Sequence, residues 1–140
     1  MRLDPYLNFN GNTEEVFNYY KKVFKKDFTS LMRFGDMPGG EKMSPADRTK
    51  ILHVALPVGD NVLMGTDALD SMNQKISAGD NFSISITLDD EAEATRIFDA
   101  LSERGDVIMP LGKEFWSDLF GICKDPFGIQ WMINFRPKQK

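Results

Sequence analysis

Apolar and polar residues follow a pattern along this chain that occurs twice. Residues 3–65 predict a strand, a helix and three further strands, and residues 81–135 predict the same series. Placing Phe9 on Leu88 aligns the strands that open the two copies. The 140-residue chain is therefore expected to form one domain (1–140) of two tandem modules. The main cleft of such a duplicated fold lies between its copies.

The strand over residues 82–88 shows the strictest alternation. Its apolar positions are Phe82, Ile84, Ile86 and Leu88, and its polar positions are Ser83, Ser85 and Thr87. This alternation predicts a sheet with one buried apolar face and one polar, uncharged face. The hydroxyl groups of the polar face either line a ligand cleft or lie on an ordinary open surface, and this strand alone does not separate the two.

Two amphipathic helices are predicted to cover the apolar faces. Apolar residues recur at helical spacing over 13–24, with Thr13 as a candidate N-cap, and over 91–103. The remaining clear strands form two hairpins and cover residues 50–57, 62–65, 119–124 and 129–135. The long connections over 35–49 and 66–80 are typical of lids or mobile segments.

Composition and charge argue against several classes of function. A net charge of −4 and a pI near 5.0 are atypical of nucleic-acid-binding proteins, which present a basic stripe. No apolar run approaches the ~20 residues of a membrane span, and the first residues do not read as a signal peptide. The single cysteine, Cys123, excludes an internal disulfide and suits a reducing compartment. A cytoplasmic location is therefore expected.

Several short motifs occur in a characteristic order along the chain. They are Pro5-Tyr6-Leu7-x-Phe9-x-Gly11-Asn12, Tyr19-Tyr20-Lys21-Lys22-Val23-Phe24, His53-Val54-Ala55-Leu56, Leu63-Met64-Gly65-Thr66-Asp67, Met109-Pro110-Leu111, Phe115-Trp116 and Asp125-Pro126-Phe127-Gly128-Ile129-Gln130-Trp131-Met132. Together they resemble the PhnB-like proteins of the vicinal oxygen chelate superfamily, which also contains glyoxalase I, bleomycin-resistance proteins and extradiol dioxygenases. The resemblance covers essentially the whole chain. It implies an α+β fold in which two tandem βαβββ modules form an open, curved, eight-stranded mixed sheet (the cup), with the helices on its outer face.

The resemblance also implies where a metal ion would bind. In glyoxalase-like members of the superfamily the ligands come from the first and last strands of each module, and these positions fall on Asp4, Met64, Ser83 and Met132. Only Asp4 is a suitable ligand for a hard or borderline divalent ion. No metal and no cofactor are therefore expected. Members of this subfamily have been labelled demethylubiquinone methyltransferases, but the chain lacks the Gly-rich turn and parallel βα alternation of a nucleotide-cofactor site.

His53, the only histidine, is the remaining candidate for chemistry. Strand alternation puts it on the cup side, where an imidazole can donate or accept a proton near neutral pH. The other interpretation is a neutral, hydrogen-bonded histidine among cleft side chains, because no Asp or Glu can be placed beside it. Alternation puts Cys123 on the cup side too, although a lone cysteine among apolar neighbours is usually a small core residue. The residues predicted to line the cup and bind a ligand are Tyr6, Asn8, His53, Met64, Ser83, Ser85, Gln130 and Met132, with Trp116 at the rim.

Two classes of function are compatible with these residues. The favoured hypothesis is a binding protein that holds a small apolar or aromatic molecule in the cup without metal, as bleomycin-resistance relatives sequester drugs without chemistry. The alternative is a metal-dependent lyase, isomerase or dioxygenase of the glyoxalase kind, which needs several good ligands where only Asp4 and His53 are found. A third interpretation is a dimeric domain whose cup is vestigial. The residues do not decide whether the protein catalyses a reaction.

A symmetric homodimer is also expected. Many members of the superfamily pair modules between chains, and strand edges beside the cup would otherwise stay unpaired.

Overall fold

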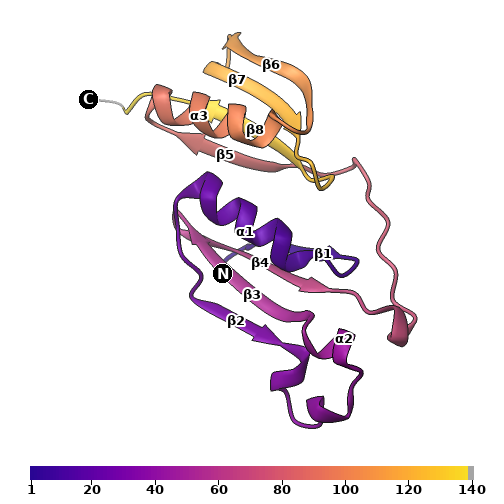
Figure 1. Cartoon of the computed structure of the whole chain (residues 1–140). Coiled ribbons are helices and arrows are strands. Elements are labelled where there is room, and N and C mark those ends of the chain that lie inside the picture. The colour runs from indigo at the N-terminus through magenta and orange to yellow at the C-terminus, as the bar shows by residue number, and fades with distance from the viewer. Residues whose placement is uncertain (139–140) are drawn as a thin grey trace. The chain divides into compact units, whose positions relative to one another are not determined.

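The computed structural model describes residues 1–138, and the chain separates into two compact units, residues 1–77 and the residues from Ala78 onward. Each unit contains one module. Each module is a four-stranded mixed sheet with one long helix against one of its faces (Figure 1).

Module one consists of four strands and one long helix, which follows the first strand. The main elements are β1 (Tyr6–Phe9), α1 (Thr13–Phe24), β2 (Ser30–Arg33), β3 (Ile51–Val58) and β4 (Asn61–Asp67). Short helical segments lie in the two long connections: η1 (Phe34–Asp36), η2 (Gly40–Lys42), α2 (Pro45–Arg48) and η3 (Asp70–Met72). The strand order is β1-β4-β3-β2, in which β1 runs parallel to β4 and the other neighbours are antiparallel.

Module two repeats this arrangement. Among its described residues the elements are β5 (Ile84–Leu88), α3 (Glu91–Ser102), β6 (Asp106–Glu114), β7 (Ser117–Lys124) and β8 (Gln130–Phe135). The order β5-β8-β7-β6 again joins a parallel pair, β5 with β8, to antiparallel neighbours. The predicted fold class is confirmed: the chain is α+β, with two tandem βαβββ modules. Within residues 1–138 the eight strands are hydrogen-bonded as two sheets of four.

The strand register makes the two modules equivalent at their first and last strands. Tyr6 lies opposite Met64 in the β1–β4 pair, and Ser85 lies opposite Met132 in the β5–β8 pair. The repeat predicted from the sequence superimposes the same two first-strand residues, Tyr6 on Ser85. Met64 and Met132 therefore occupy corresponding positions, each beside the first strand of its module.

Helix α1 packs on one face of the module-one sheet (Figure 1). Its residues Val16, Phe17 and Tyr20 are fully buried, as is Leu56 on β3. Such apolar burial is the main favourable contribution to folding. Gly65 on β4 permits the close approach of the helix, because a Cβ at this position would lie only 2.5 Å from Phe17 Cε1.

The start of α1 differs from the expectation for Thr13. This residue is the first of the helix rather than its N-cap, and Asn12 at the N-cap position makes no side-chain cap hydrogen bond. Instead, the Thr13 N–H donates to Oδ1 of Asp67, at the end of β4, over 2.9 Å. Oδ2 of the same carboxylate accepts from the Ile51 N–H over 2.8 Å. The buried carboxylate of Asp67, which is distant in sequence, thus accepts a hydrogen bond from a backbone N–H in the first turn of α1. A side chain next to the helix start was expected to fill this role.

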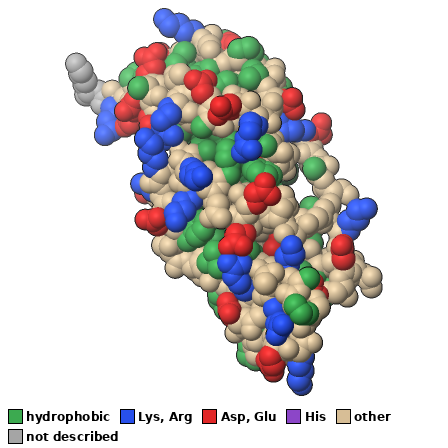
Figure 2. Space-filling model, in the orientation of Figure 1, with side chains coloured by type: hydrophobic (Ala, Val, Ile, Leu, Met, Phe, Trp, Pro, Cys, Tyr) green, Lys and Arg blue, Asp and Glu red, His purple; other side chains and the backbone are tan. Residues whose placement is uncertain are grey.

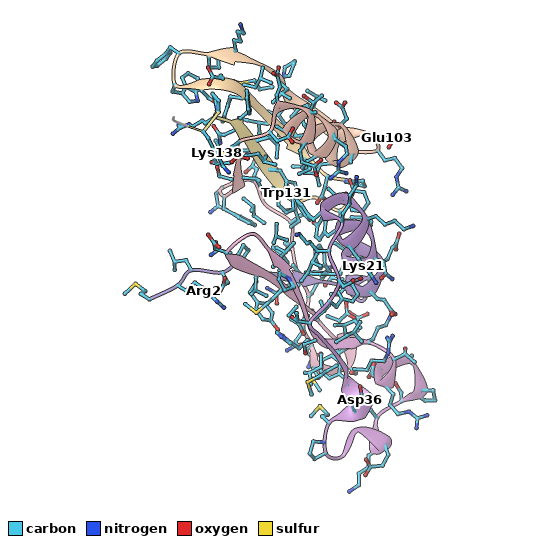
Figure 3. The ribbon with its side chains drawn as sticks, turned by 90° about the vertical axis from the view of Figure 1, so that its left-hand side faces the viewer. Arg2, Lys21, Asp36, Glu103, Trp131 and Lys138 are labelled. Atoms are coloured by element: carbon cyan, nitrogen blue, oxygen red, sulfur yellow. The ribbon has the colours of Figure 1, made fainter. Side chains whose placement is uncertain are left out.

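Trp131 on β8 anchors the core of module two (Figure 3). Its indole N–H donates to Oδ2 of buried Asp125 over 2.9 Å. Oδ1 of Asp125 accepts from the N–H groups of Phe127 and Ile129, which fixes the turn before β8. Cys123 lies opposite Trp131 in the β7–β8 pair and has no exposed surface. The cup-side parity assigned to Cys123 is therefore wrong, because the register puts it on the side that packs under α3, and the other interpretation, a small core residue, is confirmed.

Strand β5 is shorter and more exposed than its sequence pattern predicts. It begins at Ile84, so Phe82 lies outside the strand and keeps 51% of its surface exposed. Ile84, Ile86 and Leu88 are only partly buried. In its own sheet β5 is an edge strand that pairs with β8 alone, so fewer neighbours cover its apolar side.

Charged side chains of both signs are interspersed over the surface seen in Figure 2. The basic run of α1 lies at the C-terminal end of the helix, where Lys21 pairs with Asp27 over 3.5 Å (Figure 3). Cations are favourable at this end of a helix. Among residues 1–138, no helix combines the length and apolar character needed to cross a membrane.

Candidate functional site

In module one, the side of the sheet turned away from α1 carries the predicted site residues of that module. Alternation along β1 and β3 directs Leu7, Phe9 and Val54 toward the helix as buried core. We call the opposite side face one. It is formed by Tyr6, Asn8, Met32, His53, Met64 and Thr66. The four module-one residues predicted to bind a ligand thus lie on the same side of one sheet.

Tyr6 and His53 form a hydrogen-bonded pair on face one. The Tyr6 hydroxyl and His53 Nδ1 are 2.9 Å apart, and the ring centroids are 5.7 Å apart with the planes inclined by 32°. Partial burial raises the pKa of Tyr6, so the phenol stays protonated at neutral pH. Met64 belongs to β4, the strand between those of the pair. Face one therefore combines a polar pair with a polarizable thioether.

Asp4, the carboxylate at a superfamily metal-ligand position, is occupied by contacts within module one. Its Oδ1 accepts from the Val62 N–H over 2.9 Å, and its Oδ2 accepts from Arg2 Nε over 2.8 Å. The hydrogen bond from Val62 and, to a lesser degree, the contacts with Arg2 hold the pKa of Asp4 below its ordinary value. The carboxylate therefore fastens the segment before β1, which carries Arg2 (Figure 3), to the β3–β4 hairpin.

Face two is the corresponding side of module two, turned away from α3. It is formed by Ser83, Ser85, Phe120, Gln130, Met132 and Asn134. Gln130 Nε2 donates to Ser83 Oγ over 2.6 Å, and Asn134 Nδ2 donates to Ser85 Oγ over 3.3 Å. Met132 lies between Gln130 and Asn134 along β8. Face two thus has a central thioether between two pairs of neutral hydrogen-bonding side chains.

Trp116 reaches face two from the hairpin between β6 and β7. Its ring meets buried Phe120 edge to face, with the centroids 5.4 Å apart. Phe115 contacts the same indole at 4.8 Å but is itself 96% exposed. Trp116 therefore covers Phe120 and keeps part of its own ring available for stacking.

Sequence reasoning missed four residues of these faces: Met32, Thr66, Phe120 and Asn134. Thr66 shares the alternation of Met64 along β4 and lies opposite Asn8. Asn134 shares the strand alternation of Gln130, so the same parity argument could have identified it. Met32 and Phe120 are assigned only by their strand partners, His53 and Asn134 respectively. Their positions needed the pairing register, which a single sequence does not provide.

The superfamily's metal-ligand positions carry one carboxylate, one hydroxyl and two thioethers in this chain. Among residues 1–138, no group of three or more His, Cys, Asp and Glu side chains is arranged to hold a metal ion. The hydroxyl of Ser83 is hydrogen-bonded, the carboxylate of Asp4 is occupied, and Met64 and Met132 supply only thioethers. These donors do not fit a hard or borderline divalent ion.

The two long connections are held at defined points of module one. Residues 35–49 form short helical turns, and Asp47 in this segment accepts a hydrogen bond from Ser71 in the other connection over 2.7 Å. The Asn10 side chain exchanges two hydrogen bonds with the backbone of Ile76, each 2.8 Å long. These contacts define where the connections lie, and a role as lids stays a prediction.

Comparison with known proteins gives matches over nearly the whole chain. A family model described as 3-demethylubiquinone-9 3-methyltransferase matches residues 2–134. The crystal structure of PA1353 from Pseudomonas aeruginosa is 39% identical, with 99% of both chains covered and a TM-score of 0.85.

Two more distant structures share the fold. A PhnB protein from Bacillus cereus, titled a putative 3-demethylubiquinone-9 3-methyltransferase, is 23% identical, with 97% of this chain and 100% of that chain covered and a TM-score of 0.78. A glyoxalase/bleomycin resistance protein/dioxygenase family enzyme from Burkholderia phytofirmans is 14% identical, with 95% and 98% covered and a TM-score of 0.61.

Proposed function

We propose that this chain binds a small apolar or aromatic molecule without a metal ion. The chain belongs to the PhnB-like family of the vicinal oxygen chelate superfamily, whose family model is described as 3-demethylubiquinone-9 3-methyltransferase. The observation that carries the proposal is the pair of corresponding methionines, Met64 and Met132, each beside polar, hydrogen-bonding side chains. Thioethers adapt to irregular apolar and aromatic surfaces. A few neutral donors and acceptors beside them suit the orientation of a small ligand.

The chemistry of the available side chains argues against a metal-dependent reaction. The Asp4 carboxylate already accepts hydrogen bonds from Val62 and Arg2. The Nδ1 atom of His53 is hydrogen-bonded to Tyr6, so this histidine could offer a metal ion only its Nε2 atom. Since a catalytic metal needs several ligands and an open position, no reaction step is assigned to a metal here.

Methyl transfer, the activity in the family's description, would need a site for a methyl donor. The N-terminus of α1 is occupied by the Asp67 carboxylate, and that of α3 by Asp90, whose Oδ1 accepts from the Glu93 N–H over 3.1 Å. Carboxylates at these positions take up amides that would otherwise bind an anionic cofactor group. The proposed function therefore does not include methyl transfer.

Metal analysis of untagged protein, followed by a thermal-shift screen of small aromatic compounds, tests the proposal. Elemental analysis should find far less than one Zn, Ni, Mn or Fe per chain, and Asp4→Ala should not change that content. Compounds that bind should raise the melting temperature, because a ligand specific for the folded state stabilises it by mass action. The stabilisation should fall in Met64→Gln or Met132→Gln, which keep side-chain length but remove apolar character. Met72→Gln, an exposed methionine on η3, is the matched control.

Two outcomes would contradict the proposal. About one metal ion per chain, lost in Asp4→Ala, would favour a glyoxalase-type metalloenzyme. Ligand stabilisation that survives unchanged in both Met64→Gln and Met132→Gln would mean that the ligand binds away from these faces.

A further inference from the structure

The Tyr6–His53 pair joins two strands that are not neighbours in the sheet. Tyr6 belongs to β1 and His53 to β3, and β4 lies between them. The pair therefore spans β4 on the side turned away from α1, over the strand that carries Met64. Tyr6 is 44% exposed. A polar bridge that is still accessible thus crosses the middle of face one.

Hydrogen-bonding capacity limits what the neutral pair can offer a ligand. When the Tyr6 hydroxyl donates to Nδ1 of His53, the imidazole carries its proton on Nε2, which then points a donor away from the pair. In the other tautomer Nδ1–H donates to the Tyr6 oxygen, and the hydroxyl hydrogen is released outward. Either way the neutral pair has one free donor. Among residues 1–138, no hydrogen-bond partner of Nε2 competes for it.

Protonation of the imidazole doubles this capacity. A protonated His53 uses Nδ1–H to hold the Tyr6 oxygen, so the Tyr6 hydroxyl and Nε2–H both become free to donate. The pair then also carries a positive charge. A free donor beside a positive charge matches an anionic oxygen, and charge-assisted hydrogen bonds are roughly twice as strong as neutral ones.

The surroundings of the pair contain little that would compete with this role. His53 faces Tyr6 from β1, Met32 from β2, and Met64 and Thr66 from β4, and of these only Tyr6 titrates. The charged residues at the strand ends have other partners: Asp4 (Val62 N–H), Arg33 (Glu14), Lys50 (Gly11 carbonyl) and Asp67 (Thr13 N–H). Met32 is 43% exposed directly opposite His53, so apolar surface adjoins the polar bridge.

We infer that the Tyr6–His53 pair recognises an acidic oxygen, a carboxylate or phenolate, on an apolar or aromatic ligand whose body lies against Met32 and Met64. The inference rests on the proposed function and narrows it to one class of ligand. The bound form has His53 protonated, and one free donor of the pair, either Nε2–H or the Tyr6 hydroxyl, is directed at the ligand oxygen. Affinity for an acidic ligand therefore increases as the pH is lowered, because binding and protonation of His53 favour each other.

Matched pairs of probes test the inference. Benzoate and 2-naphthoate are compared with benzamide and 2-naphthamide by calorimetry on the untagged full chain at about pH 6 and pH 8. The carboxylates should bind roughly tenfold more tightly than the amides at the lower pH, and the difference should shrink at the higher pH. His53→Gln should abolish the pH dependence. Tyr6→Phe should weaken carboxylate binding and leave amide binding unchanged, whereas Tyr19→Phe on α1 should change neither.

A second measurement uses the wild-type protein, so it does not require that any variant folds. Because His53 is the only histidine, nitrogen NMR of labelled protein gives a single imidazole whose tautomer and titration can be followed without assignment. Linkage requires that a carboxylate which prefers protonated His53 moves the midpoint of this titration to higher pH when it binds. The amides should leave the midpoint unchanged.

The outcomes separate this inference from the proposed function. Equal binding of carboxylates and amides, or a pH dependence that persists in His53→Gln, would overturn the inference while metal-free ligand binding stands. An imidazole titration that does not move when carboxylate binds would also overturn it. Absence of binding by both series would contradict the proposed function, and the inference with it.

Discussion

Replacement of Asp67 by alanine should destabilise module one strongly. This carboxylate is only 3% exposed, and it accepts hydrogen bonds from the N–H groups of Thr13 at 2.9 Å and Ile51 at 2.8 Å. The first contact satisfies the start of α1, and the second holds the beginning of β3 two residues before His53. Alanine would leave both donors without their acceptor in a buried position.

The size of the effect follows from these two contacts. Loss of the acceptor of a buried donor costs about 1–3 kcal/mol, and loss of a helix cap about 1 kcal/mol. Since the Thr13 contact is also the cap, the two costs overlap there, and we expect about 3 kcal/mol for Asp67→Ala. Asp67→Asn keeps one carbonyl acceptor and should lose roughly half as much.

Urea denaturation followed by far-UV circular dichroism measures the effect, with the slope of the transition as a check on its cooperativity. Both tryptophans, Trp116 and Trp131, belong to module two, so their fluorescence reports separately on that module. Asp60→Ala, which removes an exposed carboxylate from the β3–β4 turn, is the matched control and should change stability by less than about 0.5 kcal/mol. A loss below about 1 kcal/mol for Asp67→Ala, at unchanged slope, would refute the assigned role of this carboxylate.

Three further predictions concern acid stability, the thiol and assembly. The hydrogen bonds from Val62 to Asp4 and from Arg33 to Glu14 lower the pKa of each carboxyl, so their stabilising effect is present above about pH 4 and is lost as the pH falls through the lowered values. Asp4→Asn and Glu14→Gln should therefore lose less stability than the wild type in urea titrations between about pH 5 and pH 2.5, and equal losses would contradict the assigned contacts. Burial raises the pKa of Cys123 to about 12, so the thiol stays protonated in the folded protein. A thiol reagent at about pH 8 should therefore modify Cys123 only after unfolding. Rapid modification of the folded protein would contradict this prediction and show that the site opens. Light scattering should give twice the chain mass of 15.9 kDa, as expected for a homodimer, and a monomeric mass at micromolar concentration would contradict this.

The elements that depend on local periodicity could be predicted from the sequence. Helix α1 runs over the predicted residues 13–24, and α3 ends at Ser102, one residue before its predicted end. The repeat also aligned Tyr6 with Ser85, which the strand ladders make equivalent. These predictions succeed because alternation and helical spacing are properties of neighbouring residues, which a single sequence contains.

Local pattern gave less reliable results where a residue's surroundings come from distant parts of the chain. Phe82 continues the apolar alternation of β5 but is half exposed, because the strand begins only at Ile84 and Phe82 lies outside it. Strand alternation put Cys123 on the cup side, whereas its partner Trp131 puts it in the core, as its apolar neighbours indicated. Parity along one strand does not fix which side faces the helix when the strand bounds and register are unknown.

The sequence by itself determined the family, the two βαβββ modules and the poor set of metal ligands, since each depends on residue identity and order along the chain. Only the tertiary structure decided how the polar groups are used. Asp4 binds the Val62 amide, Asp67 caps a helix that begins 54 residues earlier, and Tyr6 meets His53 across an intervening strand. These partners are far apart in sequence, and hydrogen bonds form only at about 3 Å. Register and packing, which bring distant strands to that separation, therefore decided the candidate site.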